Sequence, residues 1–309
     1  MSVPPPPPPI HLPGQQAARA YVCAWCGAQG SGTELTCRAC GAAIDVKAVV
    51  SDSGWVELPA IKDMAKLQFG RSSCQIEGLY VPVAEMNLDA QDGVYFTHHV
   101  LLWMDPQIRL GILPLQGGWK RLRAGLPLIM AQAQGPGHIA FSDDRPGELV
   151  ALPLQPGQAV DVREHVFMVA TGQLAYEWFA TNIWFETGTG NDKEIHFPLG
   201  QFMDRFISGQ QPGLLLIHGG GNIFTRRLAP HERILIKPSS LLFKDPTVNM
   251  HLHIERSSYL GGNWFTVGPR HLWLQLSGPG RIAVESAYGH FHDPGRAISG
   301  HSYATIRQW

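Results

Sequence analysis

From Trp55 onward, apolar residues occur in short runs that alternate with polar positions and are separated by Gly, Pro and Asn. The alternation is clearest in three segments, Val160–Arg163, Ile234–Ile236 and Met250–Glu255. A period of two residues is typical of a β-strand that buries one face. No long stretch has the helical period, and the best short helix candidate is Gln201–Ile207. The pattern therefore predicts an all-β fold.

Segments of this β region also resemble one another. Residues 132–141 read QAQGPGHIAF and residues 275–284 read QLSGPGRIAV, an offset of 143. A second echo, at an offset of 74, pairs Pro156, Val160 and Val162 with Pro230, Ile234 and Ile236. In that echo, Gly135-Pro136-Gly137 is matched with Gly219-Gly220-Gly221. Repeated Gly-rich turns predict duplicated β units, and chance similarity between Gly-rich strands is the alternative.

Four of the five cysteines lie close together near the N-terminus, as Cys23-x-x-Cys26 and Cys37-x-x-Cys40. Two such pairs supply four thiolates, which complete a tetrahedral zinc site and leave no position open for catalysis. A module of about 26 residues is too small to fold without the metal. We therefore predict a structural zinc ribbon over residues 21–46, bound through all four cysteines.

Two alternatives to zinc are weaker. A redox Cys-x-x-Cys pair needs a thioredoxin-like context, which the sequence lacks, and it does not explain the second pair. Iron also accepts four thiolates. The fifth cysteine, Cys74, is expected to be an inert, partly buried thiol.

The chain divides into four predicted segments. These are a disordered proline-rich tail at residues 1–20, the zinc ribbon at 21–46, a linker at 47–54 and the duplicated β domain at 55–309. The tail contains six consecutive prolines, Pro4 to Pro9, which favour polyproline II. Such a tail serves as a spacer or as a ligand for a protein partner with an aromatic groove.

Composition narrows the function classes. Hydrophobic residues make up 44% of the 309 residues, and charged residues only 16%. The net charge of −1 makes a nucleic-acid partner unlikely. No secretory signal pattern and no apolar run of about 20 residues is present, so we expect a cytoplasmic protein.

Two constellations resemble hydrolase motifs. His218-Gly219-Gly220-Gly221 resembles a lipase oxyanion-hole sequence, and Gly300–Ala304 half resembles a nucleophile elbow. The elbow requires a final Gly where Ala304 stands, and too few residues follow Ser302 to supply the acid and the histidine. We interpret the triple glycine as a turn and expect no enzyme activity.

A histidine pair on one strand suggests a different site. His251, His253 and Glu255 share one face of the strand. The metal-binding pattern of cupins begins with an arrangement of this kind. The spacing of the acidic residue and the missing preceding Gly do not fit that pattern. A solvent-facing or interface surface is the interpretation we prefer, and a metal-dependent cupin-like enzyme is kept as an alternative.

One basic cluster, Trp119, Lys120, Arg121 and Arg123, lies between Gly117-Gly118 and Gly125. An aromatic ring beside three cations is suited to contact an anionic ligand such as a lipid surface. A solvated loop is the simpler interpretation.

The body resembles a known family in the order of its short motifs. These are Trp103-Met104-Asp105, Trp119-Lys120-Arg121 with Gly125, Gly135-Pro136-Gly137, Pro146-Gly147-Glu148, Leu152-Pro153-Leu154, Gly157 and Leu274–Gly280. In this order, residues 55 to 309 resemble the mitochondrial-biogenesis family named for altered inheritance of mitochondria, number twenty-four. The zinc ribbon and the tail depart from its simpler members.

The resemblance implies duplicated, short double-stranded β-helix-like units of sandwich or barrel type, similar to the tryptophan-attenuation RNA-binding protein. It also implies a ring-like homotrimer and no known catalytic residues. Low charge and nine Trp favour self-association on independent grounds. We therefore expect a non-catalytic binding or scaffold protein, with a cupin-like enzyme or an RNA-binding protein as alternatives.

Overall fold

The computed structural model describes residues 20–22, 28–31, 38–39, 55–57, 67–78, 80–114, 129–187, 193–255 and 271–288. The chain separates into two units, residues 1–52 and 53–309, which are described separately. In the first unit, β1 (Ala20–Val22) pairs antiparallel with β2 (Gln29–Ser31). No helix within the described ranges has the length and apolarity that crossing a bilayer requires.

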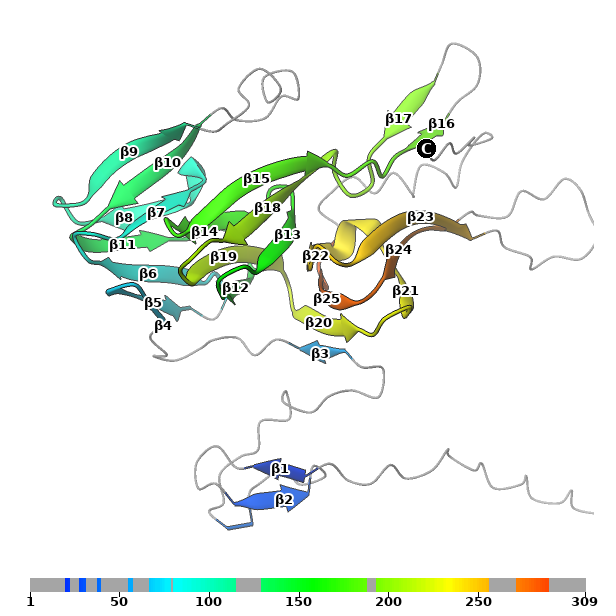
Figure 1. The fold of residues 1–309 in the computed structure, drawn as a ribbon, viewed down its shortest axis with the longest axis horizontal. Coiled ribbons are helices and arrows are strands. Elements are labelled where there is room, and N and C mark those ends of the chain that lie inside the picture. Colours follow the sequence, from blue (N-terminus) through cyan, green and yellow to red (C-terminus); the bar gives the residue numbers. More distant parts are fainter. Residues whose placement is uncertain are drawn as a thin grey trace, which may run out of the picture. The chain divides into compact units, whose positions relative to one another are not determined.

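The second unit contains three successive copies of one six-stranded repeat (Figure 1). The first repeat has β6 (Val83–Leu88), β7 (Gly93–Phe96), β8 (Leu101–Met104), β9 (Arg109–Pro114), β10 (Ile129–Gln134) and β11 (Gly137–Phe141). The second repeat has β12 (Gly147–Leu154), β13 (Ala159–Arg163), β14 (Phe167–Thr171), β15 (Leu174–Ala180), β18 (Phe202–Ser208) and β19 (Gly213–Gly220). The third repeat has β20 (Ile223–Leu228), β21 (Arg233–Ile236), β22 (Leu241–Lys244), β23 (Asn249–Glu255), β24 (His271–Ser277) and β25 (Gly280–Glu285).

Each repeat pairs its strands in the same way. The first, sixth and third strands form one antiparallel half-sheet, and the second, fifth and fourth form another. The Gly135-Pro136 and Gly278-Pro279 turns precede the sixth strand of the first and third repeats, and both peptide bonds are cis. The predicted equivalence of these two turns is confirmed, and the repetition extends to a third unit.

Neighbouring repeats share sheets. Strand β7 pairs with β14 and strand β13 pairs with β22, which joins half-sheets into a six-stranded and a seven-stranded sheet. A five-stranded sheet remains at the first repeat and a three-stranded sheet at the third. The remaining elements are β3 (Val56–Glu57), β4 (Leu67–Phe69), β5 (Ser72–Glu77), β16 (Phe185–Thr187), β17 (Glu194–His196) and the 3-10 turns η2 (His98–Val100) and η3 (Pro238–Ser240).

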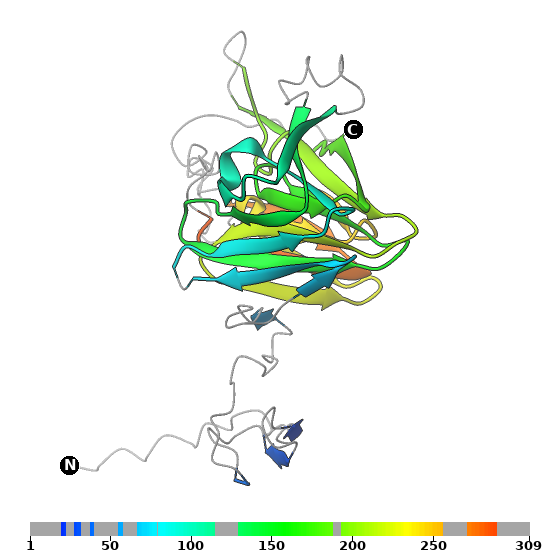
Figure 2. The same ribbon diagram turned by 90° about the vertical axis from the view of Figure 1, so that its left-hand side faces the viewer.

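Three hydrophobic cores fill the spaces between successive sheets. Phe96 and Phe141 belong to the first core, Phe206 and Phe243 to the second, and Phe185 to the third, and all five are almost fully buried. Figure 2 looks along the row of repeats, with strands of the first repeat in front. The alternation of apolar positions therefore builds a row of small β-sandwiches.

The helix expected at Gln201–Ile207 is wrong, because β18 occupies this segment. Strand β18 lies between β13 and β15 and pairs with both along its length. Phe202, Met203 and Phe206 are buried in the surrounding cores. Pairing on both edges outweighs the weak local preference of a seven-residue segment for helix.

Strand β23 confirms the predicted alternation, since Leu252 is buried while His251 and His253 are exposed. Strand β13 differs from the expectation that one face would be polar and solvated. Asp161 and Arg163 are as buried as the valines beside them, because the sheet that contains β13 has a core on each face. The polar residues of this strand are therefore internal groups that need partners.

The triple glycine is only partly a turn. His218, Gly219 and Gly220 end strand β19, where Gly220 pairs with Gly147, and only Gly221 turns the chain, at φ +66°. The second-repeat counterpart of the Gly-Pro-Gly turn lies before Gly213, at the start of the same strand. The predicted match of Gly219–Gly221 with Gly135–Gly137 is therefore wrong. The match fails because glycine also occurs within strands, as Gly219 and Gly220 do in β19, so three consecutive glycines do not by themselves identify a turn.

Candidate functional site

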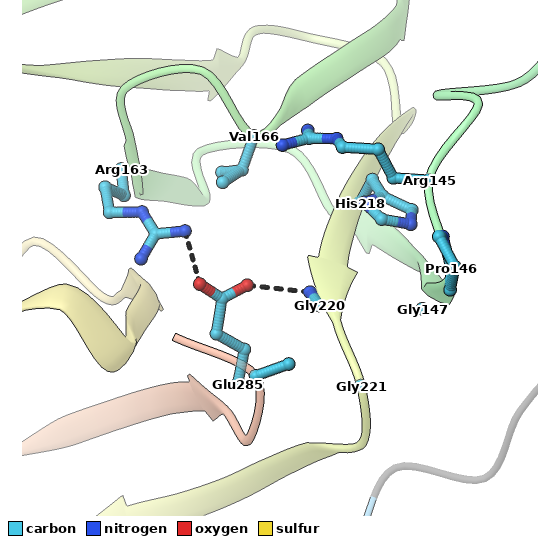
Figure 3. Close-up of a pocket in the computed structure, with 10 residues that line it drawn as sticks. Arg145, Pro146, Gly147, Arg163, Val166, His218, Gly220, Gly221 and Glu285 are labelled. Carbon is cyan, nitrogen blue, oxygen red and sulfur yellow. Dashed lines mark hydrogen bonds and ion pairs between the residues drawn. The ribbon is translucent and has the colours of Figure 1, made fainter. Parts of the chain in front are cut away.

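A cavity of about 420 Å³ lies where the second repeat meets the third. Its wall contains Arg163 at the end of β13, His218 near the end of β19 and Glu285 at the end of β25. Arg145 comes from the connection between the first two repeats. The other lining residues are small or apolar, and Figure 3 shows the four polar side chains around the cavity. A cavity of this size suits a small molecule.

Glu285 and Arg163 form a buried ion pair on one wall. The Arg163 Nη2 donates to Glu285 Oε1 at 2.6 Å, and both side chains are only 5% exposed. The Glu285 Oε2 accepts the Gly220 N–H at 2.8 Å, and the Arg163 Nη1 donates to the Ser239 carbonyl. Both carboxylate oxygens of Glu285 are therefore satisfied by the protein.

Arg145 and Asp143 form a second ion pair at the rim. The Arg145 Nε and Nη2 donate to the two oxygens of Asp143 at 2.6 and 2.8 Å. The carboxylate of Asp143 is buried, while the side chain of Arg145 is 48% exposed. This hydrogen-bonded carboxylate raises the pKa of Arg145, which keeps the guanidinium charged. In Figure 3, the guanidinium extends toward Val166 across the cavity.

His218 is a neutral imidazole in the cavity wall. The residue is 3% exposed, and burial lowers its pKa, with Asp143 acting in the opposite direction. Its Nδ1 is 3.7 Å from Asp143 Oδ2, too far for a hydrogen bond, and its Nε2 has no partner. Glycine is needed opposite the ring, because a Cβ on Gly147 would lie 2.8 Å from Nε2 and 2.2 Å from the Gly219 carbonyl oxygen.

The repeats place Ser142, His218 and Glu285 at equivalent positions. Each residue lies five positions after the glycine that begins the sixth strand, namely Gly137, Gly213 or Gly280. The sequence interpretation treated His218 as part of a turn and did not consider Glu285. The offset of 143 that relates Ser142 to Glu285 was visible in the sequence. The offset that relates either residue to His218 was not visible, because the second repeat has a different turn before its sixth strand.

A family profile described as Mitochondrial biogenesis AIM24 matches residues 74–287. The chain belongs to the AIM24 mitochondrial biogenesis family. The solved structure of protein SPYM3_0169 from Streptococcus pyogenes is similar to it, at a TM-score of 0.50 and 18% sequence identity. The match covers 70% of this chain and 94% of the streptococcal one, and shows a shared fold. No curated protein matches the chain.

The site residues predicted from the sequence lie outside the described ranges. Cys23, Cys26, Cys37 and Cys40 lie outside them, as do Trp119, Lys120, Arg121 and Arg123. The zinc site, the anionic contact and the protein partner of the proline-rich tail therefore stay predictions. Cys74 is fully buried, and burial raises the pKa of its thiol to about 12, as expected for an inert cysteine.

The predicted histidine face of β23 stands apart from the cavity. His251 and His253 are both exposed. Among the residues that the structure describes, no three His, Cys, Asp or Glu side chains are grouped as metal ligands. The cupin-like alternative therefore has no described site to support it.

The zinc ribbon leads to a direct prediction. In sequence, Cys23 and Cys26 fall in the connection between the paired strands β1 and β2. Purified protein should carry about one zinc per chain, and Cys37→Ser should lose it because an incomplete ligand set cannot hold the metal. Metal analysis checks the stoichiometry, with Cys74→Ser as a control that retains zinc. A normal zinc content in Cys37→Ser would overturn the assignment.

One strand of the first repeat is exposed where its counterparts are buried. The fractional exposures of Leu102, Trp103 and Met104 in β8 are 55%, 44% and 39%. The equivalent positions of β14 are all 0% exposed, and those of β22 are at most 4% exposed. The counterparts are buried because β7 covers the edge of β14 and β13 covers the edge of β22. Strand β8 ends its sheet without such a partner in the described part of the chain.

Strand β21 is the matching open edge at the other end. Its equivalents are β7 and β13, the strands that cover β14 and β22. Leu235 is 41% exposed, whereas the equivalent Tyr95 and Asp161 are 4% and 0% exposed. Within the described ranges, β21 ends a three-stranded sheet. The two ends therefore present the two halves of a junction that the chain forms twice internally.

Proposed function

We propose that this member of the AIM24 family is a non-catalytic scaffold that assembles head to tail into a homotrimer. Strand β21 of one copy pairs with β8 of the next. The observation that carries the proposal is the exposure of three apolar β8 residues whose counterparts are buried by the preceding repeat. Exposed apolar strand edges favour pairing with another chain.

The internal junctions specify the register of this contact. Tyr95 opposes Ala170 at the first junction, and Asp161 opposes Lys244 at the second. Phe96 opposes Val169, and Val162 opposes Phe243, one position further. Transferred to the open edges, the same register places Leu235 opposite Met104 and Ile236 opposite Trp103. All four side chains are apolar, so the junction buries hydrophobic surface on both partners.

Head-to-tail contacts close into a ring or grow into a filament, depending on the rotation between copies. A closed ring leaves neither β8 nor β21 as an open edge, which favours a finite assembly for a scaffold. Three copies of a three-repeat chain would place nine units in the ring. The low charge of the chain and the exposed Leu102 and Trp103 support self-association.

Two features support a non-catalytic role. Among the described residues that line the cavity there is no Ser, Thr or Cys, so this part of the wall offers no hydroxyl or thiol nucleophile. The family match concerns a group whose role is described only as mitochondrial biogenesis. The RNA-binding-protein-like fold that the sequence resemblance implies is not an argument for RNA binding, because function depends on sites and not on fold.

The register is tested by mixing two variants that each carry one added cysteine. We expect Leu235→Cys protein and Met104→Cys protein to form a disulfide-linked dimer under mild oxidation, which neither variant forms alone. Directly opposed residues of antiparallel strands lie within the distance that a disulfide spans. Non-reducing electrophoresis measures the product, with wild-type protein as the blank for native thiols. Ile195→Cys, exposed on β17, replaces Met104→Cys in the matched control.

Light scattering measures the assembly itself. We expect a mass three times the 34.0 kDa of one chain, and we expect Trp103→Asp to reduce it to that of the monomer. An aspartate at this edge would have to be buried without a partner in the assembled junction. A stable wild-type monomer at micromolar concentration, or equal crosslinking by Ile195→Cys, would refute head-to-tail assembly.

A further inference from the structure

We propose that the cavity lined by Arg145, Arg163, His218 and Glu285 binds a small monocarboxylate with an apolar body. Arg145 holds the carboxylate, and the apolar wall contacts the remainder of the ligand. The site is complete within one chain, so it does not depend on the assembly proposed above.

The cavity has unused hydrogen-bond donors, so its ligand should supply hydrogen-bond acceptors. Glu285 already accepts from Arg163 and from the Gly220 amide, and Asp143 accepts twice from Arg145. The carboxylates therefore have little capacity left for a ligand donor. Arg145 uses only its Nε and Nη2, although a guanidinium carries five N–H donors. Its remaining N–H groups suit the oxygen atoms of a carboxylate.

The charges of the cavity favour one negative charge over two. Arg145 and Arg163 carry two positive charges, and Asp143 and Glu285 carry two negative ones. His218 is neutral near pH 7, because burial lowers its pKa. A monoanion adds one charge beside a guanidinium that is half exposed and can share its pairing with Asp143. A dianion would add uncompensated charge to a largely buried site.

The rest of the cavity wall is apolar, which is why the proposed ligand has an apolar body. Val166, Pro146 and Ala287 contribute apolar surface, and Gly220 and Gly221 keep the space open. A Cβ on Gly220 would lie 2.8 Å from the Ala287 carbonyl oxygen, and one on Gly221 would lie 2.5 Å from Ser286 Oγ. Larger residues would therefore displace this wall. An inorganic anion of similar charge would leave the apolar surface uncovered.

The test uses benzoate as the probe, with benzamide and inorganic phosphate as matched comparisons. Benzamide keeps the ring and removes the charge, and phosphate keeps the charge and removes the ring. Titration calorimetry of the full chain should show benzoate binding at least about tenfold more tightly than either comparison, the effect of one charge-assisted hydrogen-bonded contact. Hexanoate and hexanamide repeat the comparison with an aliphatic body.

Arg145→Gln should weaken benzoate binding by at least about tenfold. The matched control is Arg281→Gln, because Arg281 is a partly exposed arginine that pairs with Asp245 and does not line the cavity. Ala287→Phe should block binding by filling the rim while leaving every ionic group in place. Circular dichroism confirms that the variants fold.

Three outcomes would overturn the site. In the first, neither carboxylate binds more tightly than its amide. In the second, the Arg145→Gln protein binds benzoate as well as the Arg281→Gln protein does. In the third, Ala287→Phe leaves benzoate binding unchanged. Tighter binding of phosphate than of benzoate would also overturn it, by replacing the proposed ligand class with an inorganic anion. The light-scattering result for assembly affects none of these measurements.

Discussion

Replacing Asp161 with Asn is expected to lower the free energy of unfolding by about 3–5 kcal/mol. Asp161 is 0% exposed and accepts hydrogen bonds from Arg205 Nε at 2.6 Å and Nη2 at 3.0 Å. It also accepts from Lys244 Nζ at 2.7 Å, across the β13–β22 junction. Lys244 is 4% exposed, so losing the carboxylate leaves a buried ammonium without its charge partner. Urea unfolding at pH 7 measures the loss.

The matched control is Glu186→Gln in the β16–β17 hairpin. Glu186 pairs with Lys193 at 2.6 Å, but the two side chains are 22% and 56% exposed. A solvated pair of this kind contributes about 0–1 kcal/mol. The double variant Asp161→Asn with Lys244→Met should recover part of the stability, because it removes both members of the buried pair. Similar small losses for Asp161→Asn and Glu186→Gln would show that the buried network is not important for stability.

Gly278→Ala is expected to destabilise the protein by about 2–3 kcal/mol. A Cβ at this position would lie 2.3 Å from the Ala229 carbonyl oxygen and 2.7 Å from Leu228 Cβ. Since the oxygen belongs to the backbone, relief requires the β20–β21 turn to move away from the turn before β25. Thermal unfolding or urea titration measures the effect.

Two further glycines complete this experiment. Gly135→Ala should have an effect of similar size, because its Cβ would lie 2.3 Å from the Asp89 carbonyl oxygen in the equivalent turn of the first repeat. Gly209→Ala should change stability by no more than about 0.5 kcal/mol, because nothing lies within 4 Å of its Cβ. If Gly278→Ala is as stable as Gly209→Ala, close packing of the turns does not explain the glycines.

Period-two alternation was sufficient to predict strands where a strand has one solvated face. Leu252 between His251 and His253 is such a case. It also predicted β13 as a strand, but the polar face expected there is buried, and it failed for β18, which was assigned to a helix. A strand in the interior of a stack of sheets carries a different hydrophobic pattern, because its environment is set by residues distant in sequence.

The repeat was visible in the sequence where its turns are alike, and in the offset of 74 that pairs Val160 and Val162 of β13 with Ile234 and Ile236 of β21. Gly135-Pro136 and Gly278-Pro279 mark the first and third repeats, but the second enters its sixth strand at Gly213 without this motif. The cavity could not be predicted from the sequence for a related reason. His218 and Glu285 line one cavity because their strands belong to adjacent repeats, and no local pattern in the sequence indicates that they lie together.

The three repeats place their extra sequence in the same connection. The fourth and fifth strands are separated by residues 115–128 in the first repeat, 181–201 in the second and 256–270 in the third. The cost of closing a loop rises slowly with its length, so this hairpin is where the fold accommodates added residues with little loss of stability. An epitope or a binding peptide placed in one connection would leave the other two, and the strand pairing of all three repeats, unchanged. The architecture thus separates a constant framework from connections of variable length, although the connection of the second repeat also supplies Ile183, Phe185 and Leu199 to the third core.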